Sequence, residues 1–301
     1  MAGTMGIAIL GGILDSIDSL QSKDSDTPTD TSTPSRLPTT FNACVRSNGS
    51  AKRISNELGK YDTKVSIHQN DNLTPVRASD IVLLACKPYM TAGILGNDDM
   101  RAALKGKLLI SILAGVPEKQ ISDALYPSGV PDDACTIVRA MPNTAAAIRE
   151  SMTVINTSTP PLPEETSKLV SWIFTRIGRV VHLPPSNMDA CTALCGSGPA
   201  FGAVMIESMA MGAIAMGVPR DEAYTMAAQT LRGMAGLALS SGDHPAVLRD
   251  KVSTPGGCTI GGLLALEEGN FRATVARAVR EATVVASQLG EGKQGVNGTR
   301  H

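Results

Sequence analysis

The sequence predicts an α/β domain built on a mostly parallel sheet, followed by an all-α domain. Short β-rich runs alternate with helical stretches through the first half of the chain. Such alternation is typical of a parallel sheet with helices on both faces. The strand signal stops after Leu183, and the residues from Pro199 to Gly290 are nearly all helical. The composition shift at Pro184 and Pro185 therefore predicts a domain boundary near residue 183.

The composition is consistent with two folded domains and argues against some partners. The chain has 301 residues, of which 43% are hydrophobic but only 3% aromatic, so the cores must be aliphatic. A formal net charge of −1 argues against a nucleic-acid-binding or anionic-membrane surface. We expect a sheet domain over 1–183, a helical domain over 184–290 and a flexible tail over 291–301.

The individual elements follow from the apolar periodicity. Strands are predicted at Phe41–Arg46, Val65–Ile67, Ile81–Ala85, Leu108–Leu113, Cys135–Arg139, Met152–Ile155 and Val180–Leu183. Helices before the boundary are predicted at Ile7–Leu14, Ser50–Gly59, Met100–Lys105, Pro117–Leu125 and Glu164–Ile177. Helices after it are predicted at Ala200–Gly217, Arg220–Ser240, Pro245–Val252, Thr259–Glu268 and Phe271–Leu289.

Residues 15–40 are predicted to form a disordered surface insertion between the first helix and the strand that begins at Phe41. From Ser22 to Thr40, 16 of 19 residues are Ser, Thr, Asp or Pro, and such a segment has little to bury. A neutral insertion is the simpler interpretation, and a regulatory phosphorylation site is the alternative.

The segment from Ala200 to Val218 carries one charge, Glu207, and is rich in Ala, Gly and Met. A helix that is apolar all round either spans a membrane or is fully buried in protein. Because small residues permit close helix packing and no basic cluster flanks the segment, we expect burial at a subunit interface rather than in a membrane.

The cysteines and the N-terminus point to the cytoplasm. The six cysteines form neither a CxxC pair nor a Cys/His cluster with zinc spacing, so we predict reduced packing residues and no metal site. No basic region precedes the first apolar stretch, and no clear cleavage site follows it, so a signal peptide is not predicted.

Gly3-Thr4-Met5-Gly6 directly precedes the helical run Ile7–Leu14 and matches the second half of a GxGxxG loop. In such loops the glycines let backbone amides approach a pyrophosphate at a helix N-terminus. Alone, the motif is weak evidence, but the alternating architecture strengthens it and favours a Rossmann-like dinucleotide-binding domain.

The strand that ends at Arg46 is expected to lie beside the adenine ribose. NAD-specific folds carry an acidic residue there, whereas this chain has Arg46 and then Ser47. A guanidinium and a hydroxyl suit a 2′-phosphate, so NADP is favoured, with an ordinary solvated basic turn as the alternative.

Two later strands end at Lys87-Pro88 and near Gly115. Both ends should face the nicotinamide half of the cofactor, unless Lys87 only caps its strand.

The loop Lys251–Ile260 is the most informative stretch. Pro255-Gly256-Gly257 before a helix exposes backbone N–H groups at the positive end of a helix dipole, which suits a carboxylate. Ser253, Thr254 and Thr259 add hydroxyl groups, although a hydroxyl-capped helix start without a ligand would have the same pattern.

The four histidines are scattered along the sequence, and no carboxylate pair forms an acid/base couple. A protonated imine accepts a hydride with little help from a side-chain acid, whereas a carbonyl needs a proton donor.

Together these motifs resemble pyrroline-5-carboxylate reductases. The matching pieces are GTMG at 3–6, ACKP at 85–88, RAMPNT at 139–144, GSGPA at 196–200 and the long string at 244–269 that contains VSTPGGCTIGG. The resemblance runs from Gly3 to about Leu289 and is interrupted at 15–40. It implies a Rossmann-like NADP-binding domain followed by an all-α dimerisation domain, with homodimers that assemble into larger rings. It also implies the NADPH-dependent reduction of 1-pyrroline-5-carboxylate, a cyclic imino acid, to L-proline, with NADPH preferred over NADH.

The resemblance also implies site residues. The cofactor would be bound by Gly3, Thr4, Met5, Gly6, Arg46, Ser47, Asn72, Ala85, Cys86, Lys87, Pro88, Ile112 and Ala114. The substrate would be bound by Ser253, Thr254, Gly256, Gly257, Cys258 and Thr259, with Thr259 as the catalytic residue. Members of this family often have a small residue such as Ala or Thr at this position, so Cys258 in this chain could narrow the pocket. The alternatives are another NADP-dependent reductase of a small carboxylic acid and a catalytically impaired paralogue.

The start of the sequence carries a separate expectation. Only Met1 and Ala2 precede Gly3, whereas a dinucleotide-binding domain starts with a central strand that leads into the glycine loop. Loss of a central strand leaves both neighbours without a partner, at about 1–3 kcal/mol for each buried unpaired group. We therefore expect that the sequence as given starts too late, through a misplaced start codon or a truncated isoform, and that this chain binds NADPH poorly or misfolds.

Overall fold

The computed structural model describes residues 3–21, 33–61, 64–293 and 295–299. Its contacts divide the chain into two compact units, which are described separately. The first, here called the sheet unit, comprises Met1–Gly196 and Thr283–His301, and the second, the helical unit, comprises Ser197–Ala282. The two predicted classes of domain, α/β and all-α, are both confirmed.

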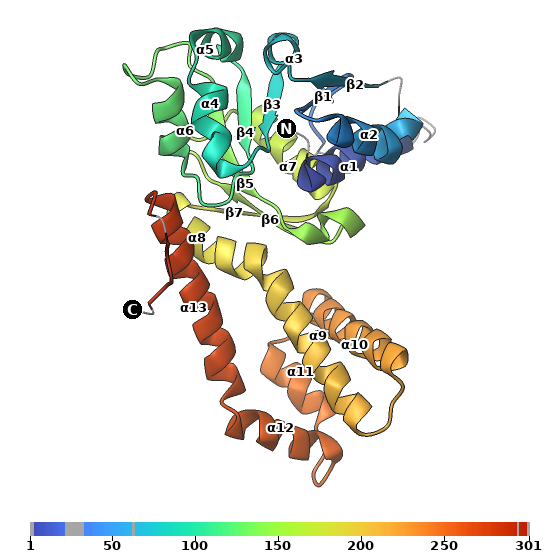
Figure 1. Ribbon diagram of the computed structural model, residues 1–301. Helices are drawn as coiled ribbons and strands as arrows, with labels where there is room; N and C mark the ends of the chain where they lie inside the picture. The colour runs from blue at the N-terminus through green and yellow to red at the C-terminus, as the bar shows by residue number, and fades with distance from the viewer. Residues whose placement is uncertain (1–2, 22–32, 62–63, 294, 300–301) are drawn as a thin grey trace. The chain divides into compact units, whose positions relative to one another are not determined.

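The strands of the sheet unit lie in two groups (Figure 1). β1 (Phe41–Val45) pairs in parallel with β2 (Val65–Gln69). The other five follow the order β3 (Ile81–Leu84), β4 (Leu108–Ser111), β5 (Thr136–Met141), β6 (Ser151–Asn156) and β7 (Gly178–Leu183). All neighbours are parallel except β5 and β6. The seven predicted strands are confirmed, with ends that differ by at most two residues.

The helices of the sheet unit connect these strands. They are α1 (Thr4–Gln21), α2 (Asn48–Leu58), α3 (Leu73–Arg77), α4 (Thr91–Leu95), α5 (Asp98–Leu104), α6 (Glu118–Leu125), α7 (Glu164–Thr175) and α8 (Met188–Cys191). The helical unit contains α9 (Gly198–Ala215), α10 (Arg220–Ser241), α11 (Pro245–Val252), α12 (Cys258–Glu268) and most of α13 (Phe271–Gly290). The short helices α3, α4 and α8 have no counterpart among the predicted elements.

Side-chain alternation along the buried strands builds a core on each face of the five-stranded sheet. Leu109 of β4 packs with α4, α5 and α6, whereas Leu108 and Ile110 pack with α1 and α7. Successive side chains of a strand point to opposite faces, so a continuous apolar run serves both cores. Figure 1 shows α4, α5 and α6 gathered on one side of the strands.

The structure corrects the predicted insertion at 15–40. Residues 15–21 belong to α1, because Ile13, Leu14 and Ile17 extend its buried face beyond the predicted end. Ser35 donates two hydrogen bonds to the Glu165 carboxylate, at 2.8 and 2.6 Å, so this part of the segment is tied to α7. Residues 22–32, the centre of the predicted insertion, lie outside the described residues.

The boundary between the units also lies elsewhere than at 183. Met188 and Cys191 of α8 pack against Met141 and Val154 of the sheet, so the contacts keep residues up to Gly196 in the sheet unit. The last turns of α13, from Thr283, belong to the sheet unit as well. Glu291–Lys293 and Gly295–Thr299 contain neither helix nor strand.

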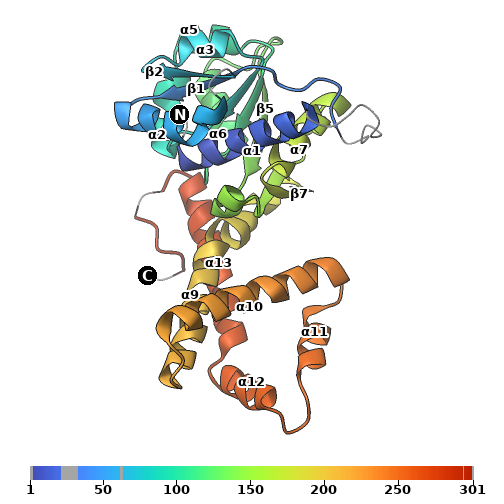
Figure 2. The ribbon, with the colours of Figure 1, turned by 90° about the vertical axis from the view of Figure 1, so that its right-hand side faces the viewer.

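The helical unit has a small core of its own. Helices α9 and α10 pack against each other (Figures 1 and 2), and their shared core consists of Ala210, Ala223 and Ala227 with partly buried neighbours. Large apolar side chains on α9 remain exposed, including Val204 at 61% and Met211 at 53%. By length and composition, the continuous helical stretch Pro185–Ala215 could cross a membrane.

Candidate dinucleotide and substrate sites

The N-terminus of α1 presents backbone N–H groups, those of Thr4, Met5 and Gly6, that are here called the α1 cradle. The first hydrogen bond of the helix runs from the Ile7 N–H to the Gly3 carbonyl, at 3.0 Å. The N–H groups of Thr4, Met5 and Gly6 therefore have no partner within the helix. The space where a side chain would stand at Gly3 is empty to 4 Å. An anion can approach these amides at the positive end of an 18-residue helix.

The ends of β1 and β2 bring Arg46, Ser47 and Asn72 into one region. Arg46 is exposed directly after β1, and Ser47 is the N-cap of α2, where its hydroxyl accepts a hydrogen bond from the Ser50 N–H at 3.3 Å. The Asn70 N–H donates to the Val45 carbonyl at 2.8 Å, which holds the chain leading to Asn72 beside Arg46. A cation and a second helix N-terminus thus meet at this strand end, and both attract a phosphate.

The ends of β3 and β4 are held together in the same way. The Ile112 N–H donates to the Leu84 carbonyl at 3.1 Å, so Ala85–Pro88 and Ile112–Ala114 leave adjacent strands side by side. Lys87, Pro88 and Ala114 are exposed. The Cys86 side chain is buried in the core, and burial raises the pKa of its thiol, so a contact between Cys86 and a ligand would come from its backbone.

One cavity joins these segments. It measures about 410 Å³ and is lined by Gly6, Cys44 and Ala85 among others. The structure therefore places the α1 cradle, the end of β1 and the end of β3 around one space. The predicted substrate residues belong to the helical unit.

These residues fit a dinucleotide phosphate. The fit rests on free amides at α1, open space at Gly3, an exposed guanidinium at Arg46 and a capping hydroxyl at Ser47. No carboxylate from Asp or Glu stands at positions 46–56, where an acidic residue would repel a 2′-phosphate.

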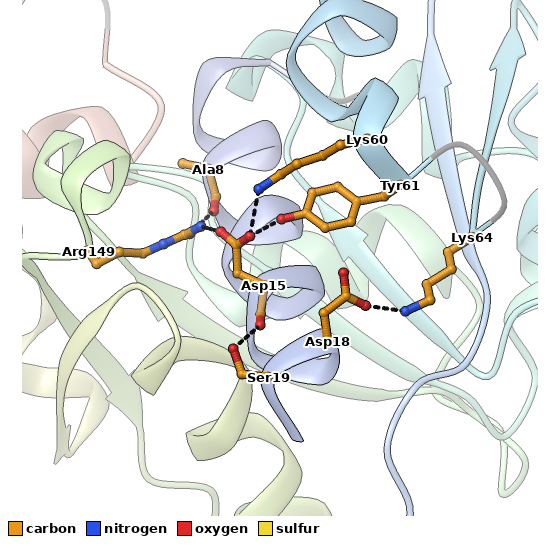
Figure 3. A network of polar contacts seen from close by, with 8 residues as sticks. All are labelled: Ala8, Asp15, Asp18, Ser19, Lys60, Tyr61, Lys64 and Arg149. Atoms are coloured by element: carbon orange, nitrogen blue, oxygen red, sulfur yellow. Dashed lines mark hydrogen bonds and ion pairs between the residues drawn. The ribbon is translucent and has the colours of Figure 1, made fainter. Parts of the chain in front are cut away.

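Polar contacts anchor α1 to the rest of the sheet unit (Figure 3). The Asp15 carboxylate accepts hydrogen bonds from Lys60 at 2.8 Å, from Arg149 at 2.5 Å and from the Tyr61 hydroxyl. Arg149 also donates to the Ala8 carbonyl at 2.9 Å. Partial burial raises the pKa of Asp15, but the hydrogen bonds from Lys60 and Arg149 outweigh it and hold that pKa below its usual value.

Gly12 allows this close approach. A β-carbon at Gly12 would lie 2.5 Å from an Arg149 guanidinium nitrogen, 2.8 Å from Ile177 and 2.9 Å from the Arg176 carbonyl. Arg149 itself ends a short helical turn in the left-handed conformation, at φ 63°, which directs its side chain toward α1. No local sequence pattern predicts this contact, since the Asp15–Arg149 pair joins residues 134 positions apart.

The predicted substrate loop folds as a β-turn followed by a helix start. The Gly257 N–H donates to the Thr254 carbonyl at 3.0 Å, Pro255 takes the second position, and Gly256 has φ +69°. This is the sequence pattern of a type II turn, which requires glycine at its third position. Gly257 is equally constrained, because a β-carbon there would lie 2.5 Å from the Thr254 hydroxyl.

The turn decides which backbone amides remain for a ligand. The Gly257 N–H is used inside the turn, so the free donors are those of Cys258 and Thr259 in the first turn of α12. The Ser253 hydroxyl donates to the Arg249 carbonyl at 2.9 Å and thus caps α11. The Thr259 hydroxyl lies 3.3 Å from the Val252 carbonyl and donates to it.

The surroundings of two side chains of this loop, Cys258 and Lys251, were not evident from the sequence. Cys258 is exposed, so the prediction that all six cysteines are packing residues is wrong for this one. The Lys251 ammonium pairs with the Asp243 carboxylate at 2.6 Å. The cation next to the turn therefore already has an anionic partner.

The fold and the cradle define a dinucleotide-dependent oxidoreductase with a Rossmann-like domain. Residues 2–115 match the family described as NADP oxidoreductase, coenzyme F420-dependent. Residues 185–289 match the family described as pyrroline-5-carboxylate reductase dimerisation.

Relatives are similar over almost their full length. The chain is 62% identical to a pyrroline-5-carboxylate reductase of Lophium arboricola, over 99% of this chain and 94% of that protein. It is 53% identical to the enzyme of that name from Neurospora crassa (99% and 94% covered) and 43% identical to that from Schizosaccharomyces pombe (96% and 97% covered). The chain belongs to the pyrroline-5-carboxylate reductase family.

Solved structures share the fold. A pyrroline-5-carboxylate reductase from Coxiella burnetii is 25% identical with a TM-score of 0.76, and 96% of each chain is covered. The pyrroline carboxylate reductase of Plasmodium falciparum, solved with NADP bound, has 24% identity, a TM-score of 0.74 and 96% coverage of each chain. The predicted fold and family are confirmed, whereas the individual site residues stay predictions.

Asp15→Asn tests whether the carboxylate charge anchors α1. A folded-state pKa that is lowered stabilises the protein above the unfolded pKa, about 3.9, and the contribution is lost as the pH falls through that value and below it. Because Asp15 is about half exposed, Asp15→Asn should lower the free energy of unfolding by only about 1 kcal/mol near pH 7. The difference from the parent chain should close toward about pH 3, as measured by urea unfolding.

Asp123→Asn is the matched control, since it removes an exposed pair with Lys119 within α6. It should cost only about 0.3 kcal/mol. An Asp15→Asn effect of equal size at both pH values would contradict a role for the carboxylate charge.

Proposed function

We propose that this chain reduces 1-pyrroline-5-carboxylate to L-proline, the last step of proline biosynthesis, with NADPH as the hydride donor. The observation that carries the proposal is the Thr254–Thr259 turn and helix start, which offers free amides and a hydroxyl oxygen but no acid. The name shared by the relatives supports it, since identity reaches 62% over nearly the whole chain.

The residues at the carboxyl edge of the sheet bind and orient the cofactor in this proposal. The amides of Thr4, Met5 and Gly6 bind the pyrophosphate, and Gly3 leaves the space for it. Arg46 and Ser47 bind the 2′-phosphate. The remaining contacts come from Asn72, Ala85, Cys86, Lys87, Pro88, Ile112 and Ala114. When bound, NADPH supplies a hydride.

The residues of the helical unit bind the substrate. The amides of Cys258 and Thr259 donate to the carboxylate, at the positive end of α12. Because the Thr259 proton is directed to the Val252 carbonyl, its oxygen presents lone pairs outward. A protonated imine N–H can donate to that oxygen, which orients the C=N carbon without a proton transfer from the enzyme.

A preference for NADPH over NADH follows from the exposed Arg46 beside the Ser47 cap. A guanidinium binds a phosphate through charge-assisted hydrogen bonds, and a ribose hydroxyl has no such charge to offer.

We infer that the active form is a homodimer formed through the helical unit, with larger rings built from such dimers, in the cytoplasm. The exposed apolar residues of α9 and α10 support this, because the core that these two helices share is small and built on three alanines. Burial against a second copy explains an apolar helix better than a membrane does, since the polar helices α10 and α13 share the unit.

Thr259→Val tests the catalytic assignment. The parent chain should oxidise NADPH in a manner that depends on 1-pyrroline-5-carboxylate. Loss of the hydroxyl should lower kcat/KM by about 10–100-fold, or roughly 1.4–2.7 kcal/mol, because the imine loses its acceptor. Thr259→Ser keeps the hydroxyl and should retain most of the activity. Unchanged kinetics in a folded Thr259→Val variant would remove Thr259 from the mechanism.

Arg46→Asp tests cofactor choice. The KM for NADPH should rise by about 10–100-fold through lost charge-assisted bonds and added repulsion, and the KM for NADH should change far less. Lys119→Asp makes the same charge change on α6, at the other side of the sheet unit from β1 (Figure 1), and should leave both values alone. An equal effect of Arg46→Asp on both cofactors would show that Arg46 does not contact the 2′-phosphate.

Met211→Glu tests assembly. The parent chain should be a dimer or larger by light scattering at micromolar concentration, and a charge on the apolar face of α9 should dissociate it. Val130→Glu is the control, because Val130 is an equally exposed apolar residue, at 65%, in a loop of the sheet unit. A parent chain that is a stable monomer would refute the interface.

A further inference from the structure

Three buried polar residues lie side by side on the central strands of the five-stranded sheet. They are Ser111 of β4, Arg139 of β5 and Asn156 of β6, which are 0%, 5% and 4% exposed, and they are here called the polar row. Ser111 is the strand partner of Arg139 in the parallel β4–β5 pair. The antiparallel register of β5 and β6 pairs Ala140 with Ile155, so one residue further it puts Asn156 opposite Arg139.

The polar row lies on one face of the sheet, between two apolar clusters. Side chains alternate along a strand, so Arg139 shares a face with Ile137 and Met141. Ile137 packs with helices α4, α5 and α6, whereas Met141 packs with α8. Residues directly paired on neighbouring strands point to the same face, so Ser111 and Asn156 lie on this face as well. The guanidinium therefore stems from the middle of an apolar face.

The charge in the polar row is not fully compensated. Nε of Arg139 and Oδ1 of Asn156 have no hydrogen-bond partner within the part of the chain that the structure describes. Burial lowers the pKa of the Arg139 guanidinium, and the Asp189 carboxylate on α8 partly opposes this shift. A buried charge with unpaired donors lowers stability, and departures of this kind occur mainly where function requires them. Packing alone therefore does not explain an arginine at this position.

The polar row ends at the loop between β4 and α6, residues 112–117, here called the β4–α6 loop. The Ser111 hydroxyl oxygen accepts a hydrogen bond from the Leu113 N–H at 3.4 Å. This oxygen has a second lone pair, which can accept from a guanidinium on the neighbouring strand. Ile112 and Ala114 of the same loop contact the cofactor in the proposed function. The polar row thus connects a buried cation with a loop assigned to the nicotinamide half of NADPH.

We propose that Arg139 is a positioning residue for the proposed reaction, which holds the β4–α6 loop through Ser111 in the conformation that presents Ile112 and Ala114 to the nicotinamide half of NADPH. A guanidinium carries five N–H donors in a rigid plane, so it can serve the strands on both sides of it. The unpaired Nε and the unpaired Asn156 oxygen are a donor and an acceptor on adjacent strands, and one ordered water between them satisfies both.

Such a role affects the orientation of the cofactor more than its affinity. In the proposed function the phosphates of NADPH are bound by the α1 cradle and by Arg46 and Ser47, none of which belongs to the polar row. Hydride transfer depends on the orientation of the nicotinamide ring, and a small misplacement can slow a reaction by about 100-fold. Loss of the Arg139 guanidinium should therefore lower kcat while the KM for NADPH stays nearly constant.

Arg139→Met tests the proposal in the full chain, since it replaces the guanidinium by an apolar side chain of similar length. The kcat should fall by about tenfold or more, and the KM for NADPH should change by less than about threefold. Without cofactor, amide exchange in peptides that cover residues 111–117 should become about tenfold faster, and the rest of the sheet unit should change little. The Tm should stay within about 3 °C of the parent chain, because a costly buried charge is removed together with its contacts.

Ser111→Ala is the second variant, because it removes the hydroxyl that links the row to the Leu113 amide. It should give the same split between kcat and KM, with kcat lowered by about three- to tenfold. Thr153→Val is the matched control. Thr153 is a fully buried residue of β6 whose hydroxyl also has no partner among the described residues, but it lies on the other face of the sheet from Asn156. This control should change neither kcat nor the exchange of residues 111–117.

Faster exchange that is spread evenly over the sheet unit of Arg139→Met would overturn the proposal, because it would show a general loss of stability. An unchanged kcat in a folded Arg139→Met variant, or a KM for NADPH that rises as much as kcat falls, would do the same. If Arg139→Met does not fold, an unchanged kcat in Ser111→Ala overturns the proposal by itself.

The exchange measurement separates this proposal from the proposed function on which it rests, since it needs neither cofactor nor substrate. A parent chain that does not reduce 1-pyrroline-5-carboxylate would contradict the proposed function. Faster exchange confined to residues 111–117 in Arg139→Met would, in that case, still support the hold of the polar row on the β4–α6 loop.

Discussion

The sheet unit depends on the close seating of α1 against the segment around Arg149 and Ile177. Gly12 has no side chain, so the Arg149 guanidinium comes within bonding distance of the Ala8 carbonyl and of Asp15. The axis of α1 is thereby fixed, and with it the direction in which the amides of Thr4, Met5 and Gly6 point. An anion site made of backbone amides has no flexible side chains to adjust, so its geometry is the geometry of the helix.

The strands and most helices could be predicted because their signal is local. Apolar runs at Ile81–Leu84 and Leu108–Ser111 have no helical period and end at Lys-Pro or at small residues. The limits of α1 could not be read in the same way, since Asp15 to Gln21 is polar enough to look like the following insertion. Its last turns are helical because Ile17 packs into the sheet unit and Asp15 pairs with Lys60 and Arg149. The α8 region likewise joins the sheet unit through contacts with Met141, which no local pattern reveals.

The two candidate sites differed in how far the sequence could define them. Pro255-Gly256 specifies a turn by its own chemistry, so the turn in the predicted substrate loop is recognisable from its residues alone. The sequence could not say that Gly257 uses its N–H inside the turn, or that Ser253 caps α11. Those bonds leave Cys258 and Thr259 as the amide donors. The pattern of glycines and hydroxyls thus predicts the loop, while the backbone hydrogen bonds decide which of its groups remain free for a ligand.

The chemistry of an imine is compatible with the proposed active site, a loop that contains no acid. The loop from Lys251 to Ile260 contains no histidine or carboxylate, and its single cation is paired with Asp243. Reduction of a carbonyl would leave a developing alkoxide without a proton donor here. A protonated imine instead brings its own proton and loses its positive charge when the hydride arrives. In the proposed reaction the enzyme needs only to hold the nitrogen and the carboxylate, which is the role proposed for the Thr259 oxygen and the two helix amides beside it. The proposed role depends on the Val252 carbonyl, because this carbonyl accepts the Thr259 proton and leaves the hydroxyl oxygen as an acceptor.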